Sequence, residues 1–212
     1  MQSLHDSVLI IACGALAREI NALVEQHHWQ HVKLQCIDAR LHNRPALIPQ
    51  RVAEKIRQNR DKFDRIFVAY ADCGTGGAID RVLEAEGVER LPGAHCYQFY
   101  AGKDRFAALS EAEPGTFYLT DFLARNFDRL VMRPLKLDRH PELRDAYFGN
   151  YRKLVYLSQT LDDELKNSAK LAAQQLRLPF EHLHCGYGGL ERGLVAFAAE
   201  QSHGQENTRL LA

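Results

Sequence analysis

Short apolar runs that each end in a Cys-Gly pair are the feature that most limits the fold of this chain. Three segments have this form: 8–14, 66–74 and 180–186. Each run is too short for a typical helix and has the length of a buried strand. The apolar residues that follow it have helical spacing. Alternating strands and helices predict an α/β fold with a mostly parallel, doubly wound (Rossmann-like) sheet.

Further elements are expected between these segments. We expect strands over 32–37, 88–91 and 115–120, and helices over 15–24, 49–60, 78–86 and 121–130. The C-terminal third is expected to be mainly helical, apart from a last strand and helix on either side of Cys185. We expect a single domain over 1–212, with a polar tail from about residue 201 that frays.

An aromatic stripe is expected on a helix over 147–160. Its members, at helical spacing, are Tyr147, Phe148, Tyr151 and Tyr156. Such a stripe favours the core or a subunit interface, and hence a homo-oligomer, over a cofactor site.

Charge and composition exclude several classes of protein. Lys+Arg and Asp+Glu each number 27, so the net charge is zero and no basic field attracts nucleic acid. No apolar stretch approaches the roughly 20 residues that span a membrane. The first residues lack the basic flank and cleavage site of a signal peptide. We therefore expect a cytoplasmic protein whose five cysteines, an odd count, stay reduced.

The cysteines at the expected strand ends indicate a metal centre. Because ligands bind at the carboxyl ends of strands in open α/β sheets, Cys13, Cys73 and Cys96 are expected to meet in one crevice. Three cysteines with one open position suit catalytic zinc and equally an iron–sulfur cluster. His42, in the loop after the second strand, is a candidate fourth ligand, although a solvated histidine is the more frequent outcome. Cys13 and Cys73 precede expected helices, whose N-termini favour a thiolate.

Two other interpretations of the cysteines stay open, and with them the question whether the protein is an enzyme. No Cys-x-x-Cys pair is present, so the cysteines could be core residues of an interaction protein, as we expect for Cys36. Alternatively, Cys73 is a nucleophile with Asp72 or His95 as its base.

A glycine-rich loop follows the third expected strand. It comprises Gly74, Thr75, Gly76 and Gly77, directly before an expected helix. Backbone N–H groups there could bind a phosphate or carboxylate of a small anionic ligand. The loop matches neither a Walker motif nor G-x-G-x-x-G, and a tight turn that needs glycine explains it equally well. Asp72 and Asp121 also lie at strand ends, where Asp121 is expected to cap a helix.

Several strings, taken together, carry a resemblance to a known family. They are ACGAL at 12–16, LHNRP at 41–45, DCGTGG at 72–77, HCY at 95–97, GTFYLTDFL at 115–123 and YFGNY at 147–151. Over about residues 8–195 the chain resembles the bacterial and archaeal family catalogued as domain of unknown function 1638. Members of that family are encoded near corrinoid-dependent methyltransferases and corrinoid-reactivating proteins.

The resemblance implies a role in one-carbon methyl transfer or in corrinoid protein reactivation, with a corrinoid protein or methyltransferase as the partner. In such a system a zinc site would activate a thiol that accepts the methyl group, whereas a cluster would pass electrons. The chain lacks the D-x-H-x-x-G motif, which argues against a histidine-ligated corrinoid on this chain.

Overall fold

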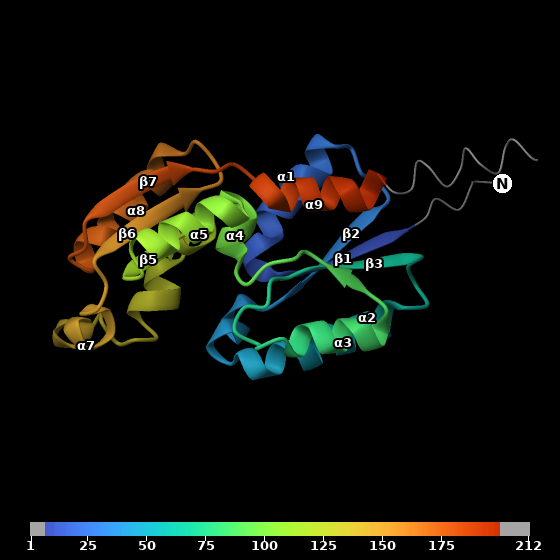
Figure 1. The fold of residues 1–212 in the computed structure, drawn as a ribbon, viewed down its shortest axis with the longest axis horizontal. Coiled ribbons are helices and arrows are strands. Elements are labelled where there is room, and N and C mark those ends of the chain that lie inside the picture. Colours follow the sequence, from blue (N-terminus) through green and yellow to red (C-terminus); the bar gives the residue numbers. More distant parts are fainter. Residues whose placement is uncertain (1–6, 200–212) are drawn as a thin grey trace, which may run out of the picture. The chain divides into compact units, whose positions relative to one another are not determined.

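The computed structural model describes residues 7–199, which form two compact units (Figure 1). Of the described residues, 7–99 and 188–199 build the first unit, and Tyr100–Tyr187 build the second. Each unit has its own parallel sheet with interleaved helices, so the α/β class is confirmed. The sequence led us to expect one domain with one sheet; the structure has two units with one sheet each. The expected frayed tail from residue 201 lies outside the described residues.

The first unit contains a four-stranded parallel sheet in the order β2-β1-β3-β4. Its strands are β1 (Val8–Cys13), β2 (Val32–Ile37), β3 (Arg65–Ala69) and β4 (Glu89–Arg90). Its helices are η1 (Gly14–Leu16), α1 (Ala17–Gln26), η2 (Ala39–Asn43), η3 (Pro45–Leu47), α2 (Ile48–Asn59), α3 (Ala78–Glu86) and α9 (Gly188–Ala199), and α4 (Cys96–Ala101) begins in it. Figure 1 shows α1 and α9 on one face of this sheet and α2 and α3 on the other.

The central strand of the first unit is buried along its whole length. All six residues of β1 are at most 4% exposed, because β2 and β3 pair with both of its edges and helices cover both faces. A strand buried on both faces has a continuous apolar sequence rather than an alternating one. The sequence therefore identified β1 correctly, and the strand holds Cys13 at the carboxyl edge of the sheet.

The second unit contains a three-stranded parallel sheet in the order β5-β6-β7. Its strands are β5 (Thr116–Leu119), β6 (Lys153–Ser158) and β7 (Phe180–His184). Its helices are α5 (Lys103–Ala112), α6 (Asp121–Arg125), the π-helix η4 (Asp128–Met132), η5 (Pro141–Leu143), α7 (Arg144–Phe148) and α8 (Asp163–Gln175).

The helix expected over 147–160 is wrong, because α7 ends at Phe148 and β6 starts at Lys153. The aromatic residues have helical spacing. Strand β6, however, is buried on both faces, so its sequence lacks the alternation of apolar and polar residues that identifies most strands. Phe148 and Tyr156 lie in the core, whereas Tyr147 is 48% exposed. The core interpretation therefore holds for these two buried side chains, and the homo-oligomer stays a prediction.

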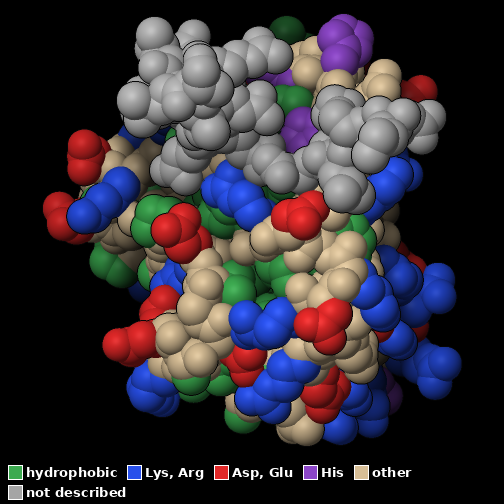
Figure 2. Space-filling model, turned by 90° about the vertical axis from the view of Figure 1, so that its right-hand side faces the viewer, with side chains coloured by type: hydrophobic (Ala, Val, Ile, Leu, Met, Phe, Trp, Pro, Cys, Tyr) green, Lys and Arg blue, Asp and Glu red, His purple; other side chains and the backbone are tan. Residues whose placement is uncertain are grey.

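The charged side chains on the surface and the lengths of the helices agree with the zero net charge and with the lack of a long apolar stretch in the sequence. On the face drawn in Figure 2, basic and acidic side chains are interspersed rather than separated by sign. One such group joins Arg57 and Arg60 to Glu86 at 2.7 Å each. Within the part of the chain that the structure describes, every helix is too short or too polar to cross a membrane.

Candidate metal centre

Three of the five cysteines come together at the carboxyl edge of the first sheet. A charged Cys13 raises the pKa of both Cys73 and Cys96, and a charged Cys73 raises the pKa of Cys96. All three would also raise the pKa of the Tyr70 phenol. The three thiols and the Tyr70 hydroxyl are therefore close enough to act on one another electrostatically, and we call them the thiol cluster. All five cysteines are free thiols.

Two strand ends and one helix start place the three sulfurs. Cys13 is the last residue of β1, and its sulfur accepts the N–H of Ala15 at 3.4 Å, at the start of η1. Cys73 lies in the loop after β3 with a left-handed backbone, φ 50°. Such a conformation is costly for a residue other than glycine and is found most often at functional sites. The N–H of Cys73 donates to the carbonyl of Ala94 at 2.9 Å, which joins this loop to the one that carries Cys96.

Arg90 fixes the loop that precedes Cys96. Its Nη1 donates to the carbonyls of Leu91 at 2.7 Å and Gly93 at 3.3 Å. Its Nε and Nη2 form a bidentate ion pair with the carboxylate of Asp80 in α3, at 2.6 and 2.9 Å. The guanidinium therefore connects β4, the loop and α3, and acts as a positioning residue for the thiol cluster.

Tyr70 is the residue of this site that the sequence did not predict. Its side chain is fully buried, and its hydroxyl has no hydrogen-bond partner within the described residues. The hydroxyl lies close enough to Cys13 to lower the pKa of that thiol, but the pair does not reach regular hydrogen-bond geometry. An unsatisfied buried hydroxyl costs about 1–3 kcal/mol, so it points to a ligand or to a chemical change at the site. The sequence feature that could have indicated Tyr70 is its position at the end of an apolar run, where an aromatic residue with a hydroxyl replaces a purely apolar one.

His42 lies beside the thiol cluster rather than away from it. Its ring stacks on the Tyr70 ring with centroids 6.0 Å apart and planes at 14°. Its Nδ1 bonds the carbonyl of Ala39 at 2.8 Å, and a carbonyl only accepts, so Nδ1 carries the proton. The side chain is exposed, and in the neutral form of the ring Nε2 would have the free lone pair, as in metal-binding histidines whose other nitrogen donates to a carbonyl.

The donor set suits a soft metal, although it is not assembled as a coordination sphere. No three His, Cys, Asp or Glu side chains within residues 7–199 form a group ready to hold a metal ion. Sulfur ligands with a neighbouring imidazole are nevertheless the donors that zinc and iron–sulfur clusters select. Ligation would require the sulfurs to turn toward one point.

The expected thiolate character of Cys13 and Cys73 is wrong. Burial raises the pKa of Cys13 to about 11 and that of Cys73 to about 12, and it raises the pKa of Cys96 as well. Loss of hydration exceeds the stabilisation from the backbone N–H groups, because the thiols lie inside the fold. All three are protonated at neutral pH. This argues against Cys73 as a nucleophile, since the thiolate is the reactive form.

Asp72 belongs to the turn rather than to acid–base chemistry. Its carboxylate accepts bonds from the Thr75 hydroxyl at 2.5 Å and from the N–H groups of Gly77 at 2.8 Å and Gly76 at 3.2 Å. Burial alone would raise its pKa, but these donors outweigh that effect and the pKa is lowered. A carboxylate with a lowered pKa and three internal donors is a weak general base.

The glycine-rich loop is accounted for by the same contacts. Gly74, Gly76 and Gly77 have φ of 82°, 62° and 77°, which glycine adopts without strain. Two of the amides that were expected to bind an anion donate to Asp72 instead. The tight-turn interpretation therefore explains the loop, and an anionic ligand would have to displace Asp72. The Thr75 hydroxyl also accepts the N–H of Ile79 at 3.4 Å, in the first turn of α3.

The remaining candidates lie outside the thiol cluster. Cys36 is exposed on β2, so the expectation of a core residue is wrong. Cys185 belongs to the second unit, where its thiol contacts the carbonyl of Leu183 at 3.7 Å. His95, the alternative base, is exposed, with its ring 6.4 Å from that of Tyr97.

Alkaline pH is expected to destabilise the metal-free protein through these thiols. Their pKa is raised in the folded state, so the stabilisation is fully present below about pH 9 and is lost as pH rises through about 11 and 12. Between pH 8 and pH 10 the free energy of unfolding should fall by about 2 kcal/mol, after allowance for the partial exposure of Cys73. Urea denaturation at both pH values measures this fall. A Cys13→Ala/Cys73→Ala double variant should lose clearly less, and an equal loss would rule out the thiols as the cause.

Comparisons with known proteins identify a family but no function. A family model described as "Protein of unknown function (DUF1638)" matches residues 36–194. This range includes His42, Cys73 and Cys96 and begins after Cys13. No curated protein matches the chain, and no solved structure does.

Proposed function

This chain belongs to the family of proteins of unknown function DUF1638, and we propose that it binds zinc or an iron–sulfur cluster through Cys13, Cys73 and Cys96. One observation carries the proposal: the fully buried Tyr70 hydroxyl has no hydrogen-bond partner within the described residues and lies near three thiols, of which Cys13 is buried and Cys73 and Cys96 are partly buried. A thiol is a weak acceptor, whereas a metal-bound thiolate carries the charge that makes sulfur a good one. Metal binding would therefore give the Tyr70 hydroxyl the acceptor that it lacks.

Electrostatics favour the same conclusion. Three thiolates this close would repel one another, which contributes to the raised pKa of Cys73 and Cys96. A bound cation replaces the protons and compensates for the repulsion, since a metal deprotonates a coordinating thiol outright. Buried thiols that are inert without metal thus become ligands with it.

The fourth position has a candidate ligand in His42. Its Nδ1 is held by the carbonyl of Ala39, which leaves Nε2 to bind a metal from the neutral ring, and the ring already stacks against Tyr70. The imidazole either completes a four-ligand site or stays at its rim and leaves one position open, as catalytic zinc sites do. With zinc the centre would hold a substrate thiolate at neutral pH, and with a cluster it would pass electrons.

The role in methyl transfer and the corrinoid partner follow from the family resemblance alone. We propose them as the context in which the centre acts: a corrinoid protein or methyltransferase would present the methyl group, or the cobalt centre that needs reactivation. Whether the chain is itself the catalyst stays open in this proposal.

Metal analysis of matched cysteine variants tests the centre. The full chain is purified without oxygen, and zinc and iron are measured by mass spectrometry beside the visible absorption spectrum. We expect close to one site equivalent in the unsubstituted protein and a loss of most of it in Cys13→Ser, Cys73→Ser and Cys96→Ser. Visible absorption that accompanies iron would identify a cluster, and colourless protein with zinc a zinc site.

The control is Cys185→Ser, which removes a thiol of the second unit and should keep its full metal content. Tyr70→Phe should keep the metal but bind it more weakly, because the sulfur loses its hydrogen-bond donor. Protein that is metal-free and also refuses added zinc and iron would overturn the proposal, as would equal losses in Cys185→Ser and Cys73→Ser.

A further inference from the structure

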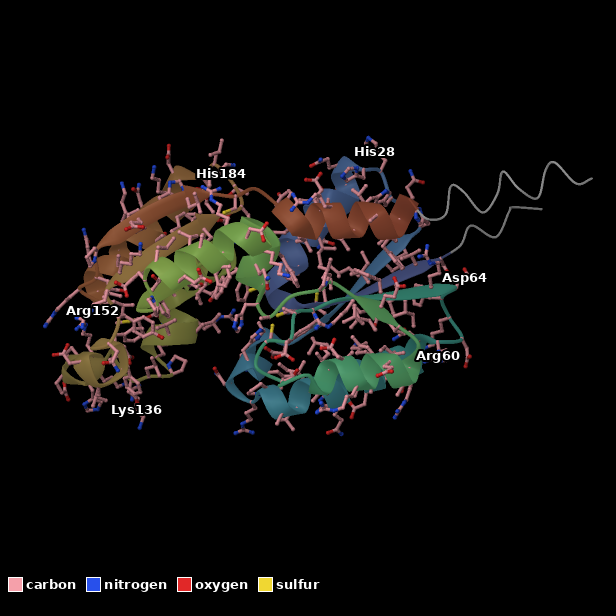
Figure 3. The ribbon with its side chains drawn as sticks, in the orientation of Figure 1. His28, Arg60, Asp64, Lys136, Arg152 and His184 are labelled. Atoms are coloured by element: carbon pink, nitrogen blue, oxygen red, sulfur yellow. The ribbon has the colours of Figure 1, made fainter. Side chains whose placement is uncertain are left out.

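Two histidines of the second unit converge on one buried hydroxyl. The Nε2 of His182 and the Nδ1 of His184 lie 2.9 and 3.1 Å from the Oγ of Ser158. Ser158 is 1% exposed, whereas both imidazoles are exposed on β7, an edge of the sheet. Figure 3 shows His184 projecting from the end of this strand.

The strand register places these groups on one face of the sheet. Tyr156 pairs with His182 and Ser158 pairs with His184, so all four side chains share a face. The His182 ring stacks on the Tyr156 ring with centroids 5.3 Å apart. This is the face that α8 covers, because Tyr156 shares a core cluster with Leu165 and Ala169 of that helix.

Helix α8 brings two lysines to the histidines. Lys166 and Lys170 are one turn apart and so lie on the same side of the helix. The positive charges of both act on His182. Neither lysine ammonium group has a hydrogen bond or ion pair with another side chain of the described part of the chain, although acidic side chains are plentiful in the sequence. The carboxylate that acts on His182, Asp121, is bonded to Tyr156 and to the backbone of Gln159, so neither lysine is neutralised by it.

We propose that Lys166, Lys170, His182 and His184 form a binding site for a phosphate-type oxyanion, either free or as the phosphoryl group of a small metabolite, and that Ser158 holds the two imidazoles in place. The lysines supply charge, and the imidazoles supply N–H donors whose arrangement is fixed by their bonds to the Ser158 hydroxyl. A metal ion is disfavoured there, because two unpaired ammonium groups repel a cation.

Hydrolysis with Ser158 as the nucleophile is disfavoured by the same geometry. The hydroxyl lies beneath both imidazoles and is almost inaccessible to a substrate. The nearest buried carboxylate is that of Asp121. Its oxygens accept hydrogen bonds from Tyr156, Thr160 and the backbone of Gln159, and none from a histidine. The site therefore binds rather than cleaves.

Binding of sulfate, which stays a dianion throughout this range, should be tighter at pH 6 than at pH 8. Partial burial, Lys166, His184 and Lys170 lower the pKa of His182, while Asp121 acts in the opposite direction. A bound anion favours the charged imidazole, so binding takes up a proton and weakens as pH rises. Glu181 does not oppose this effect directly, because it lies on the other face of the sheet, where it pairs with Lys153 at 3.0 Å.

Titration of the histidine ring protons by NMR tests the site in the full chain. Inorganic phosphate is added first, and glycerol 3-phosphate in a second experiment; His182→Gln and His184→Gln assign the signals. We expect saturable shifts of both rings, and at least about tenfold weaker binding in a Lys166→Ala/Lys170→Ala variant. Tighter binding of the ester would identify a phosphorylated metabolite as the ligand, and equal or weaker binding the free anion.

The matched control is Lys153→Ala, which removes a lysine of the same unit from the opposite face. Its affinity for phosphate should equal that of the unsubstituted protein. The proposal is overturned if neither probe gives a saturable shift, or if Lys153→Ala loses as much affinity as the double variant.

Discussion

Replacing Asp121 with alanine is expected to lower the free energy of unfolding by about 3–5 kcal/mol. The side chain is 1% exposed, and its carboxylate accepts four hydrogen bonds. The donors are the Tyr156 hydroxyl at 2.6 Å, the N–H of Gln159 at 3.0 Å, and the N–H and hydroxyl of Thr160 at 2.9 and 2.6 Å. Alanine would leave the buried Tyr156 hydroxyl and the buried Gln159 N–H without their acceptor, and each such group costs about 1–3 kcal/mol. The two donors of Thr160 are exposed and can bond to water instead. Urea denaturation of the full chain measures the loss.

Two further variants separate the network from the general effect of removing a charge. Tyr156→Phe removes one of the four donors and should cost about 1–2 kcal/mol. Asp61→Ala removes an exposed aspartate from a turn and should stay within about 0.5 kcal/mol. A loss for Asp121→Ala no larger than that for Tyr156→Phe would show that the carboxylate does not hold the network together.

The sequence located Asp121 but not its role. It predicted an aspartate at a strand end that caps a helix, whereas the capping side chain is that of Thr120, which accepts the N–H of Leu123 at 3.4 Å. The bonding partners of Asp121 lie 35 to 39 residues later in the chain, at the carboxyl end of β6. Local spacing carries no information about such partners, and the strand that supplies them was expected to be a helix.

Strand prediction succeeded where turn chemistry marked the strand end. The runs before Cys13, Cys73 and Cys185 correspond to β1, β3 and β7, because a Cys-Gly pair closes each apolar run. For β6, helical spacing of aromatic residues competed with a short buried strand, and periodicity alone cannot separate the two. The division into two units was not visible either, because nothing in the composition changes near Tyr100 or Tyr187.

The thiol cluster could be predicted as a meeting of strand ends but not as a chemical environment. The rule that parallel strands end at one edge brought Cys13 and Cys73 together correctly. Their protonation state depends on burial, which tertiary packing decides, and there the helix-dipole argument was too weak. The sequence did not predict Tyr70, because only tertiary packing decides whether the hydroxyl of a buried tyrosine has a hydrogen-bond partner.

Metal binding to the thiol cluster is expected to release about three protons, so affinity should rise by about tenfold per proton, or roughly 1000-fold in all, for each pH unit. The pKa of Cys13 is raised to about 11 and that of Cys73 to about 12, and the pKa of Cys96 is raised as well. All three thiols therefore carry protons throughout the range from pH 6 to pH 8, and each must lose one to become a ligand. The slope should stay constant over this range, because no ligand thiol titrates within it.

Calorimetric titration with zinc in two buffers of different ionisation enthalpy counts the protons directly. Cys96→Ser should release about two protons and Cys185→Ser about three, since only the first removes a ligand. A count near three with this pattern would assign all three sulfurs to the metal. A count near zero, or one that Cys96→Ser leaves unchanged, would mean that zinc binds elsewhere, and the buried Tyr70 hydroxyl would then need another partner to explain it.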